Sequence, residues 1–240
     1  MAKIHFVLQG KGGVGKSMIA AVLAQYLTEH ARQPMCIDTD PVNATLAGYT
    51  ALPVRRIELM EGDEINPRKF DAMVELIAPA ETDVIVDNGA ASFVPLASYL
   101  ISNQVPALFQ DMKHELIVHT VVTGGQALQD TMTGFVNLVE QFPAECQFAV
   151  WLNPYWGAVE YEGKTFEQMR GYTANKGRIS AIIRIPALKQ ETYGHDFGEM
   201  LRARRTFAEA LGDPELTIMT RQRLKIVQRQ LWQQLDVAGV

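Results

Sequence analysis

The chain has 240 residues, a formal net charge of −5 and a hydrophobic content of 48%. This length allows one large α/β domain, or two small ones, with a sizeable buried core. The net charge argues against a surface coated for nucleic-acid binding, and no apolar run approaches the roughly 20 residues that span a bilayer. The N-terminus lacks the long apolar centre of a signal peptide, so we expect a cytoplasmic protein.

Cysteine and histidine residues do not predict a metal centre or a disulfide. The two cysteines, Cys36 and Cys146, lie in apolar stretches without Cys-x-x-Cys spacing, and the five histidines show no ligand spacing. We therefore expect the cysteines to fill the core and the histidines to be structural or surface residues.

Strands and helices are predicted to alternate along the chain. In chain order we predict a strand at 3–9, a helix at 17–30, strands at 34–40 and 54–59, a helix at 67–78, strands at 82–89 and 115–123, a helix at 124–142, strands at 146–153 and 177–186, and helices at 198–212 and 216–235. The strands are continuous apolar runs, which is typical of parallel strands covered by helices on both faces. We predict a three-layer, doubly wound, mostly parallel α/β domain over residues 1–240, with residues 154–176 as a polar excursion from the sheet edge.

Residues 9–17, "QGKGGVGKS", lie between the first predicted strand and the first predicted helix. They match the phosphate-loop pattern Gly-x-x-x-x-Gly-Lys-[Ser/Thr]. The glycines let backbone N–H groups turn toward phosphate oxygens, and the helix N-terminus adds partial positive charge. Lys16 can bridge the β- and γ-phosphates, and the Ser17 hydroxyl can bind Mg²⁺. The predicted nucleotide contacts are Gly10, Lys11, Gly12, Gly13, Val14, Gly15, Lys16, Ser17 and Met18.

The loop contains a second lysine, Lys11, although the phosphate-loop pattern requires only Lys16. The form Gly-Lys-Gly-Gly-Val-Gly-Lys-Ser resembles the deviant Walker A motif of the ParA/MinD family of P-loop NTPases. This resemblance implies that Lys11 reaches across a dimer interface to the phosphates held by the other subunit, and so acts in catalysis together with Lys16. The alternative is a solvated surface lysine.

Two further segments extend the resemblance. Residues 36–46, "CIDTDPVNATL", are similar to the family's switch I segment, which implies that Asp38 lies near Mg²⁺ and that Asp40 orients the attacking water. Residues 83–89, "DVIVDNG", are similar to its Walker B strand and switch II segment. There, Asp87 would hold Mg²⁺ through water and Gly89 would offer its N–H to the γ-phosphate. Such a set suits phosphoryl transfer, which needs a positioned water more than a strong base. If the phosphate loop is left out of account, Asp38 and Asp40 could equally be residues that cap the end of a strand.

Two more residues resemble those with which the ParA/MinD family binds the nucleotide base, and two positions differ from the family pattern. Asn153 in "WLNP" matches the asparagine with which the family reads the adenine edge, and Pro186 in "RIP" matches the loop that packs on the base. Val42 replaces the family's usual glutamine, and Asn88 begins a segment that lacks the usual Thr/Cys-Pro-Pro. We expect nucleotide binding to survive both changes, whereas the hydrolysis rate is left open.

The resemblance implies an ATP-binding, Mg²⁺-dependent protein that hydrolyses ATP slowly and forms a nucleotide-dependent homodimer. Within the family, the chain looks most like the branch that serves conjugative plasmid DNA transfer, which implies a protein partner in the transfer machinery. One alternative is a plasmid partition or localisation scaffold with little hydrolysis. Another is an ordinary P-loop phosphotransferase, in which Lys11 would be incidental.

The C-terminal stretch, residues 216–235, has an amphipathic pattern. One stripe holds Leu224, Val227, Leu231 and Leu235, and the basic residues lie largely off it at Arg221, Arg223, Lys225 and Arg229. We expect the stripe to pack on the protein's own sheet. The alternatives are contact with an anionic membrane, with a partner or with DNA.

Overall fold

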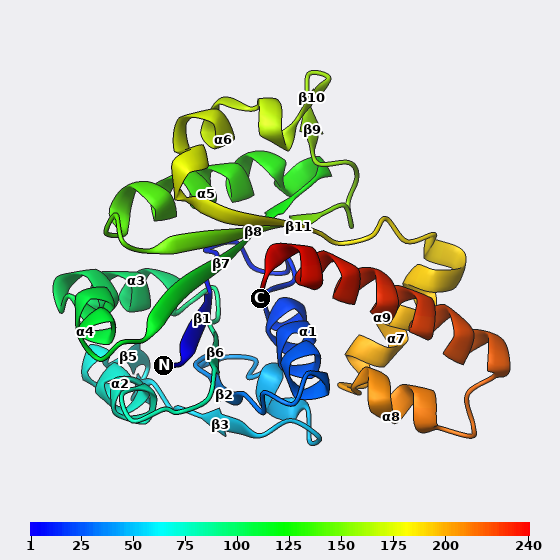
Figure 1. Ribbon diagram of the computed structural model, residues 1–240, viewed down its shortest axis with the longest axis horizontal. Coiled ribbons are helices and arrows are strands. Elements are labelled where there is room, and N and C mark those ends of the chain that lie inside the picture. Colours follow the sequence, from blue (N-terminus) through cyan, green and yellow to red (C-terminus); the bar gives the residue numbers. More distant parts are fainter.

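A seven-stranded, fully parallel sheet forms the centre of the computed structural model, which describes residues 1–240 (Figure 1). Its strands are β1 (Lys3–Val7), β2 (Met35–Asp38), β3 (Val54–Arg56), β6 (Val84–Asp87), β7 (Glu115–Thr123), β8 (Gln147–Asn153) and β11 (Ile179–Arg184). Their order in the sheet is β11-β8-β7-β1-β6-β2-β3. The chain changes sides of β1 between β6 and β7, and such a switch point is where open parallel sheets bind ligands.

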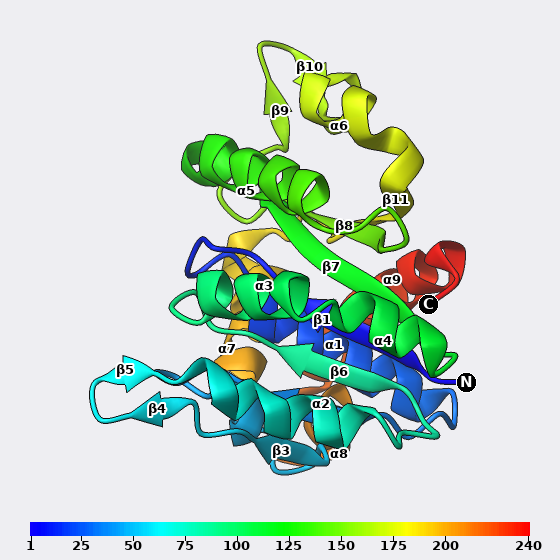
Figure 2. The same ribbon diagram turned by 90° about the vertical axis from the view of Figure 1, so that its left-hand side faces the viewer.

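Helices cover both faces of this sheet. They are α1 (Lys16–Glu29), α2 (Asp71–Ile77), α3 (Phe93–Ser102), α4 (Val105–Asp111), α5 (Leu128–Gln141), α6 (Arg170–Asn175), α7 (His195–Arg202), α8 (Phe207–Gly212) and α9 (Ile218–Ala238). In the turned view α2, α3 and α4 lie in front of the sheet, and α1 lies behind it (Figure 2). The predicted three-layer, doubly wound α/β fold is confirmed.

The core consists of two hydrophobic clusters, one on each face of the sheet. Strand β6 shows why its sequence is a continuous apolar run: Val84 and Val86 are buried in one cluster and Ile85 is buried in the other. Successive side chains of a strand point to opposite faces, so a strand covered on both faces needs apolar residues throughout.

Residues 93–111 form α3 and α4, for which the sequence pattern predicted no element. Pro95 lies in the first turn of α3 and Pro106 lies at the start of α4, where a missing N–H costs nothing because it has no partner within the helix. Gln104 between the two helices has a left-handed backbone with φ 53°. Two short helices with prolines inside them give little periodic signal, which explains the omission.

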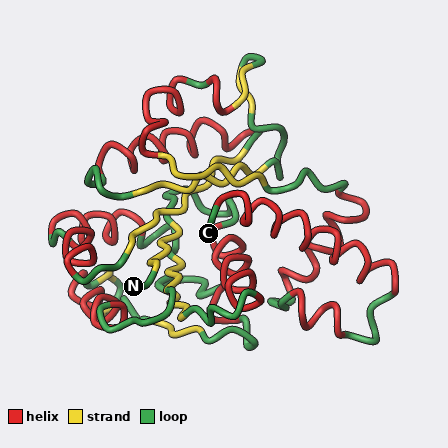
Figure 3. Tube along the Cα trace, viewed as in Figure 1, coloured by secondary structure: helices red, strands yellow, loops and turns green.

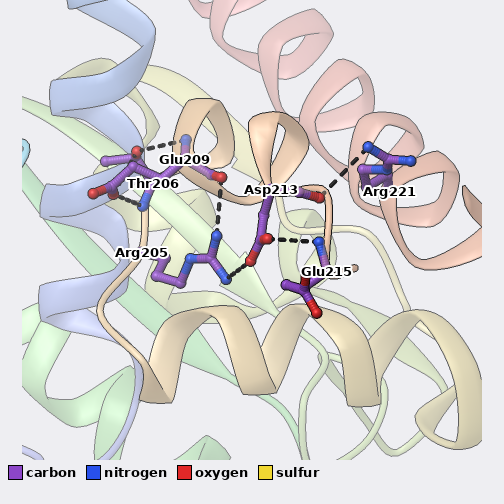
Figure 4. A network of polar contacts seen from close by, with 6 residues as sticks. All are labelled: Arg205, Thr206, Glu209, Asp213, Glu215 and Arg221. Carbon is purple, nitrogen blue, oxygen red and sulfur yellow. Dashed lines mark hydrogen bonds and ion pairs between the residues drawn. The ribbon is translucent and has the colours of Figure 1, made fainter. Parts of the chain in front are cut away.

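The prediction of one helix over residues 198–212 is wrong, because residues 203–206 separate α7 from α8. Arg204 has φ 52°, which no right-handed helix continues. Thr206 then starts α8 with a capping box, in which its side chain accepts from the Glu209 N–H while the Glu209 carboxylate accepts from the Thr206 N–H (Figure 4).

Several basic side chains near this break are paired within the chain. The Arg205 guanidinium lies 2.7 Å from the Asp213 carboxylate, and Arg221 donates to the Asp213 carbonyl oxygen (Figure 4). The Glu215 N–H and Arg205 lower the pKa of Asp213. Arg202 forms an ion pair with Glu199 on its own helix. Arg202, Arg205 and Arg221 therefore each contact an acidic residue or a carbonyl oxygen of their own chain.

The C-terminal helix α9 packs internally through the predicted stripe. The four residues of the stripe are all buried, in the hydrophobic cluster that also contains the buried side chains of α1. Trp232 donates to the Glu29 carboxylate at 2.8 Å, and Tyr26 donates to Asp236 at 2.8 Å, which ties α9 to α1. The packing interpretation is confirmed, and no helix of the protein is long and apolar enough to cross a membrane.

Residues 154–176 leave the sheet edge, as expected. They contain the hairpin of β9 (Glu160–Tyr161) and β10 (Lys164–Thr165), followed by α6. The strand predicted over 54–59 is shorter in the structure, because β3 ends at Arg56. A second hairpin, β4 (Met60–Glu61) with β5 (Glu64–Ile65), follows it. After β11 a loop crosses to α7 on the far side of α9 (Figure 3).

Candidate nucleotide site

The glycine loop connects the end of β1 to the start of α1. Gly13 and Gly15 have φ values of 72° and 105°, a region in which side chains with a Cβ are strained. Gly15 caps α1 without a side-chain hydrogen bond, and the first turn carries no acidic residue. The N-terminal N–H groups and partial positive charge of α1 are therefore available to an anion.

Lys16 is buried behind the loop, where its Nζ donates to the Lys11 carbonyl oxygen at 3.0 Å. Burial lowers the pKa of the Lys16 amine, and the negative charges of Asp87 and Asp40 oppose that shift. The Lys16 amine is thus held against the loop and near two carboxylates, in a position where a phosphate bound to the loop would add a further negative charge that favours its ammonium form.

Asp87, at the carboxyl end of β6, is fully buried, and neither of its carboxylate oxygens completes a hydrogen bond. Burial raises the pKa of Asp87 to about 7, although the nearby Ser17 hydroxyl and the Lys16 ammonium lower it. A buried carboxylate without partners is costly, which fits a group that receives a cation and its water. Ser17 and Asp87 fit Mg²⁺, which usually takes one or two protein oxygens and completes its shell with phosphate and water.

Asp38 lies beside Asp87, since the two residues are register partners in the β2–β6 pair. Its carboxylate accepts from the N–H groups of Asp40 at 2.9 Å and Ala47 at 2.8 Å. Burial raises the pKa of Asp38, and these backbone N–H groups lower it. Asp38 therefore shapes the switch I segment, and each oxygen keeps one lone pair for a metal-bound water.

Asp40 is also fixed by its own segment. One of its oxygens accepts from the N–H groups of Val42 at 2.9 Å and Asn43 at 3.2 Å. The departure at Val42 leaves this turn intact because only its backbone takes part, while its side chain is 71% exposed. Gly89 packs directly on the carboxylate, since a Cβ on Gly89 would lie 2.5 Å from Asp40 Cγ. The switch I and switch II segments are therefore in contact.

Asn88, the second departure, is a buried link between the two switch segments. Its side-chain oxygen accepts from the Thr39 hydroxyl at 3.1 Å and the Ser92 hydroxyl at 2.7 Å. Its amide donates to the Gly89 carbonyl oxygen at 3.0 Å, and the Ser92 hydroxyl oxygen also lies 3.2 Å from the Thr39 carbonyl oxygen. No sequence pattern indicates this network, because Thr39 precedes Asn88 by 49 residues along the chain.

Lys11 lies on the surface and is paired within its own chain. Its Nζ is 2.7 Å from Asp130 in the first turn of α5, and both side chains are about half exposed. Lys11 is therefore directed to α5 of its own chain, whereas the Lys16 amine contacts the Lys11 carbonyl oxygen within the loop. Asp130 was not foreseen, since 119 residues separate it from Lys11.

A cavity of about 250 Å³ adjoins the loop, and we call it the base cavity. Asn153 and Pro186 both line it, so the structure brings together the two residues predicted to contact the base. Asn153 donates to the Val14 carbonyl at 3.0 Å and accepts from the Tyr155 N–H at 3.1 Å. The other lining residues, which sequence reasoning did not select, include Thr123, Tyr155, Trp156, Leu188, Phe197 and Leu201.

Comparisons with known proteins agree with this geometry. A family model described as CobQ/CobB/MinD/ParA nucleotide binding domain matches residues 5–240. Two Escherichia coli proteins named Protein TraL are 72% and 69% identical to the chain over 240 residues, which is 100% of both chains in each case.

Solved structures show the same fold at low identity. A chain of the MinC:MinD cell division protein complex from Aquifex aeolicus has a TM-score of 0.53 at 13% identity and covers 96% of both chains. The septum site-determining protein MinD complexed with Mg-ADP, from Pyrococcus horikoshii OT3, has a TM-score of 0.53 at 16% identity and covers 99% of both. With the loop, the switch segments and the full-length match to the family model, the chain belongs to the CobQ/CobB/MinD/ParA nucleotide-binding family.

Proposed function

We propose that the protein binds ATP with Mg²⁺, hydrolyses it slowly and acts as a nucleotide-dependent homodimeric switch in conjugative plasmid DNA transfer. The observation that carries the nucleotide site is the buried, unpartnered carboxylate of Asp87 beside Ser17 and Lys16, facing the open N-terminus of α1. Bound Mg²⁺ would neutralise phosphate charge. Lys16 binds the β- and γ-phosphates, Asp40 positions water, and the Gly89 N–H holds the γ-phosphate.

Slow hydrolysis is supported by the way the switch segments are locked. The Asn88 bonds to Thr39 and Ser92 are buried, and the close packing of Gly89 on Asp40 leaves the carboxylate little freedom. The same observation favours a second candidate function, a scaffold with little turnover, in which ATP serves only to set the assembled state.

Exposed apolar side chains support dimerisation through the switch face. Val42, in the switch I segment, is 71% exposed, and Val94, in the first turn of α3 after the switch II segment, is 69% exposed. Lys11 lies at the same edge of the sheet, at the start of the loop. A second copy would cover these side chains and receive Lys11 at its phosphates, once the Lys11–Asp130 pair has opened. Exposed ion pairs of this kind are worth about 0–1 kcal/mol, so the pair is no obstacle.

The role in conjugative transfer rests on the sequence resemblance and on the 72% identity to a Protein TraL over the whole chain. The partner would then be a protein of the transfer machinery that binds the ATP-dependent dimer. A pull-down with the Asp40→Ala variant, which we expect to accumulate in the ATP-bound state, would identify that partner.

Two variants test the nucleotide site and the dimer separately. Lys16→Ala should abolish ATP binding in calorimetry, and unchanged affinity would remove the site assignment. Lys11→Ala should keep ATP binding and lose the ATP-dependent dimer in size-exclusion chromatography with light scattering. Asp130→Ala is its matched control, since it removes the same ion pair and should leave the dimer intact. If the wild type shows no turnover even with its partner, the scaffold function replaces the switch.

A further inference from the structure

Two large aromatic side chains stand at the base cavity in the loop that follows β8. Tyr155 is 62% exposed and Trp156 is 37% exposed, and both line the cavity. Their ring centroids lie 5.9 Å apart in an edge-to-face arrangement. Exposed aromatic side chains at a concave apolar site commonly mark a contact with a ligand or partner.

The backbone that carries these rings is locked in place. Gly124 and Gly125, between β7 and α5, pack so tightly on the loop that a Cβ on either would collide with a carbonyl oxygen of Gly157 or Trp156. Gly157 has φ 136°, which favours glycine there. The Tyr155 N–H is fixed by Asn153 at 3.1 Å. The backbone from which both rings extend is therefore fixed before a ligand binds.

The cavity in front of the rings suits one flat heterocycle. Its opposite wall comes from the loop after β11 and from α7, with Leu188, Phe197 and Leu201 among the apolar lining residues. Its volume of about 250 Å³ lies below the roughly 300 Å³ at which pockets for whole ligands begin. The glycine loop continues from its edge, so a nucleotide with phosphates on that loop would place only its base here.

We propose that Trp156, with Tyr155 beside it, is a stacking wall for the nucleotide base and determines much of the affinity for it. Asn153 has one amide proton and one lone pair left to contact the base edge, so stacking and apolar contact supply the rest. The proposal rests on the proposed function, because phosphates on the glycine loop bring the base to the cavity.

Calorimetric titration with Mg·ADP tests the wall directly. A stacked base contributes about 5- to 150-fold in affinity, so Trp156→Ala should weaken binding by about tenfold, whereas Trp156→Phe should bind nearly as the wild type does. Tyr161→Ala is the matched control, because Tyr161 is 47% exposed on β9 and does not line the base cavity. Wild-type affinity in Trp156→Ala would overturn the proposal.

A ligand without a base separates this proposal from the proposed function. Magnesium tripolyphosphate should bind equally well to the wild type and Trp156→Ala, while Lys16→Ala should lose both tripolyphosphate and ADP. Weaker tripolyphosphate binding in Trp156→Ala would overturn the stacking role, because it would show general damage to the site. Failure of the wild type to bind either probe would overturn the proposed function.

Tryptophan fluorescence gives an independent readout. Binding of Mg·ADP should change the emission of the wild type and of Trp232→Phe, in which the lost indole lies between α9 and α1. The change should vanish in Trp156→Phe. A ligand-induced change that persists in Trp156→Phe would overturn the proposal, and so would a loss of dimer at unchanged ADP affinity in Trp156→Ala.

Discussion

A buried histidine pair predicts how the stability of this protein depends on pH. His5 on β1 and His119 on β7 are fully buried, and their ring nitrogens lie 2.9 Å apart. Trp151 donates its indole N–H to Nδ1 of His119 at 3.0 Å. His119 must then carry its proton on Nε2 and donate it to Nδ1 of His5, which leaves Nε2 of His5 as a donor without a partner. Both rings are therefore neutral in the folded state.

The size of the change in folding stability with pH can be worked out from the pKa of His5 alone. Burial, followed by the charges of Lys3 and Arg32, lowers the pKa of His5 from 6.5 to about 3. Above pH 6.5 the folded and unfolded states both hold a neutral ring, so His5 makes no difference to stability. Below pH 6.5 only the unfolded chain takes up the proton, and stability falls by about 1.4 kcal/mol per pH unit, or about 2 kcal/mol at pH 5. Burial also lowers the pKa of His119 well below its usual value, so its effect has the same sign.

The substitution His5→Gln isolates this effect, since a glutamine oxygen can accept from His119 and does not titrate. Urea unfolding of both proteins between pH 8 and 5 gives the difference in free energy of unfolding, in which the other titrating groups cancel. We expect that difference to be constant above pH 7 and to shift by about 2 kcal/mol in favour of His5→Gln by pH 5. A difference that does not change with pH would refute the assignment of a neutral pair. If His5→Gln unfolds, histidine NMR titration of the wild type replaces it: the His5 signal should not move between pH 8 and 5.

Three further substitutions test the site and the core. Gly89→Ala places a Cβ 2.5 Å from Asp40 Cγ, so it should cost about 1–3 kcal/mol in urea unfolding and slow ATP turnover, whereas Gly177→Ala has no atom within 4 Å of its new Cβ and should change neither. Asp87→Asn should abolish Mg²⁺-dependent nucleotide binding. Without nucleotide at pH 8 it should also be more stable than the wild type by up to about 4 kcal/mol, because the pKa of Asp87 is raised to about 7, and this gain should disappear by pH 4. Arg178→Ala removes a guanidinium that donates to four carbonyl oxygens around the end of α5, so it should cost about 1–3 kcal/mol, and equal midpoints in denaturant would contradict that role.

The phosphate loop could be located from the sequence because its signal is local. Gly13 and Gly15 are needed at adjacent turns of one loop, and Lys16 and Ser17 follow directly at the start of α1. The strands could be located for a related reason, since a strand buried on both faces is apolar throughout. The apolar stripe of residues 216–235 likewise predicted a helix with one buried face, which is α9.

Contacts between distant segments could not be found in this way. The sequence pointed to Lys11 but not to Asp130, and it marked Asn88 as a departure without showing that Asn88 joins Thr39 to Ser92. The Lys11–Asp130 and Thr39–Asn88 contacts form only when parallel strands bring their carboxyl ends to one edge of the sheet. Pairing of that kind depends on strand order, and strand order leaves no pattern in the chain.

The sequence by itself therefore determined the fold class and the loop that we propose as the phosphate site, because both depend on local periodicity and on glycine conformations. The tertiary structure decided what surrounds that site. It placed a carboxylate without partners at Asp87, closed Gly89 onto Asp40, and set Trp156 against the base cavity. These features arise from the burial and close approach of segments far apart in the chain, and such proximity exists only once the sheet has formed.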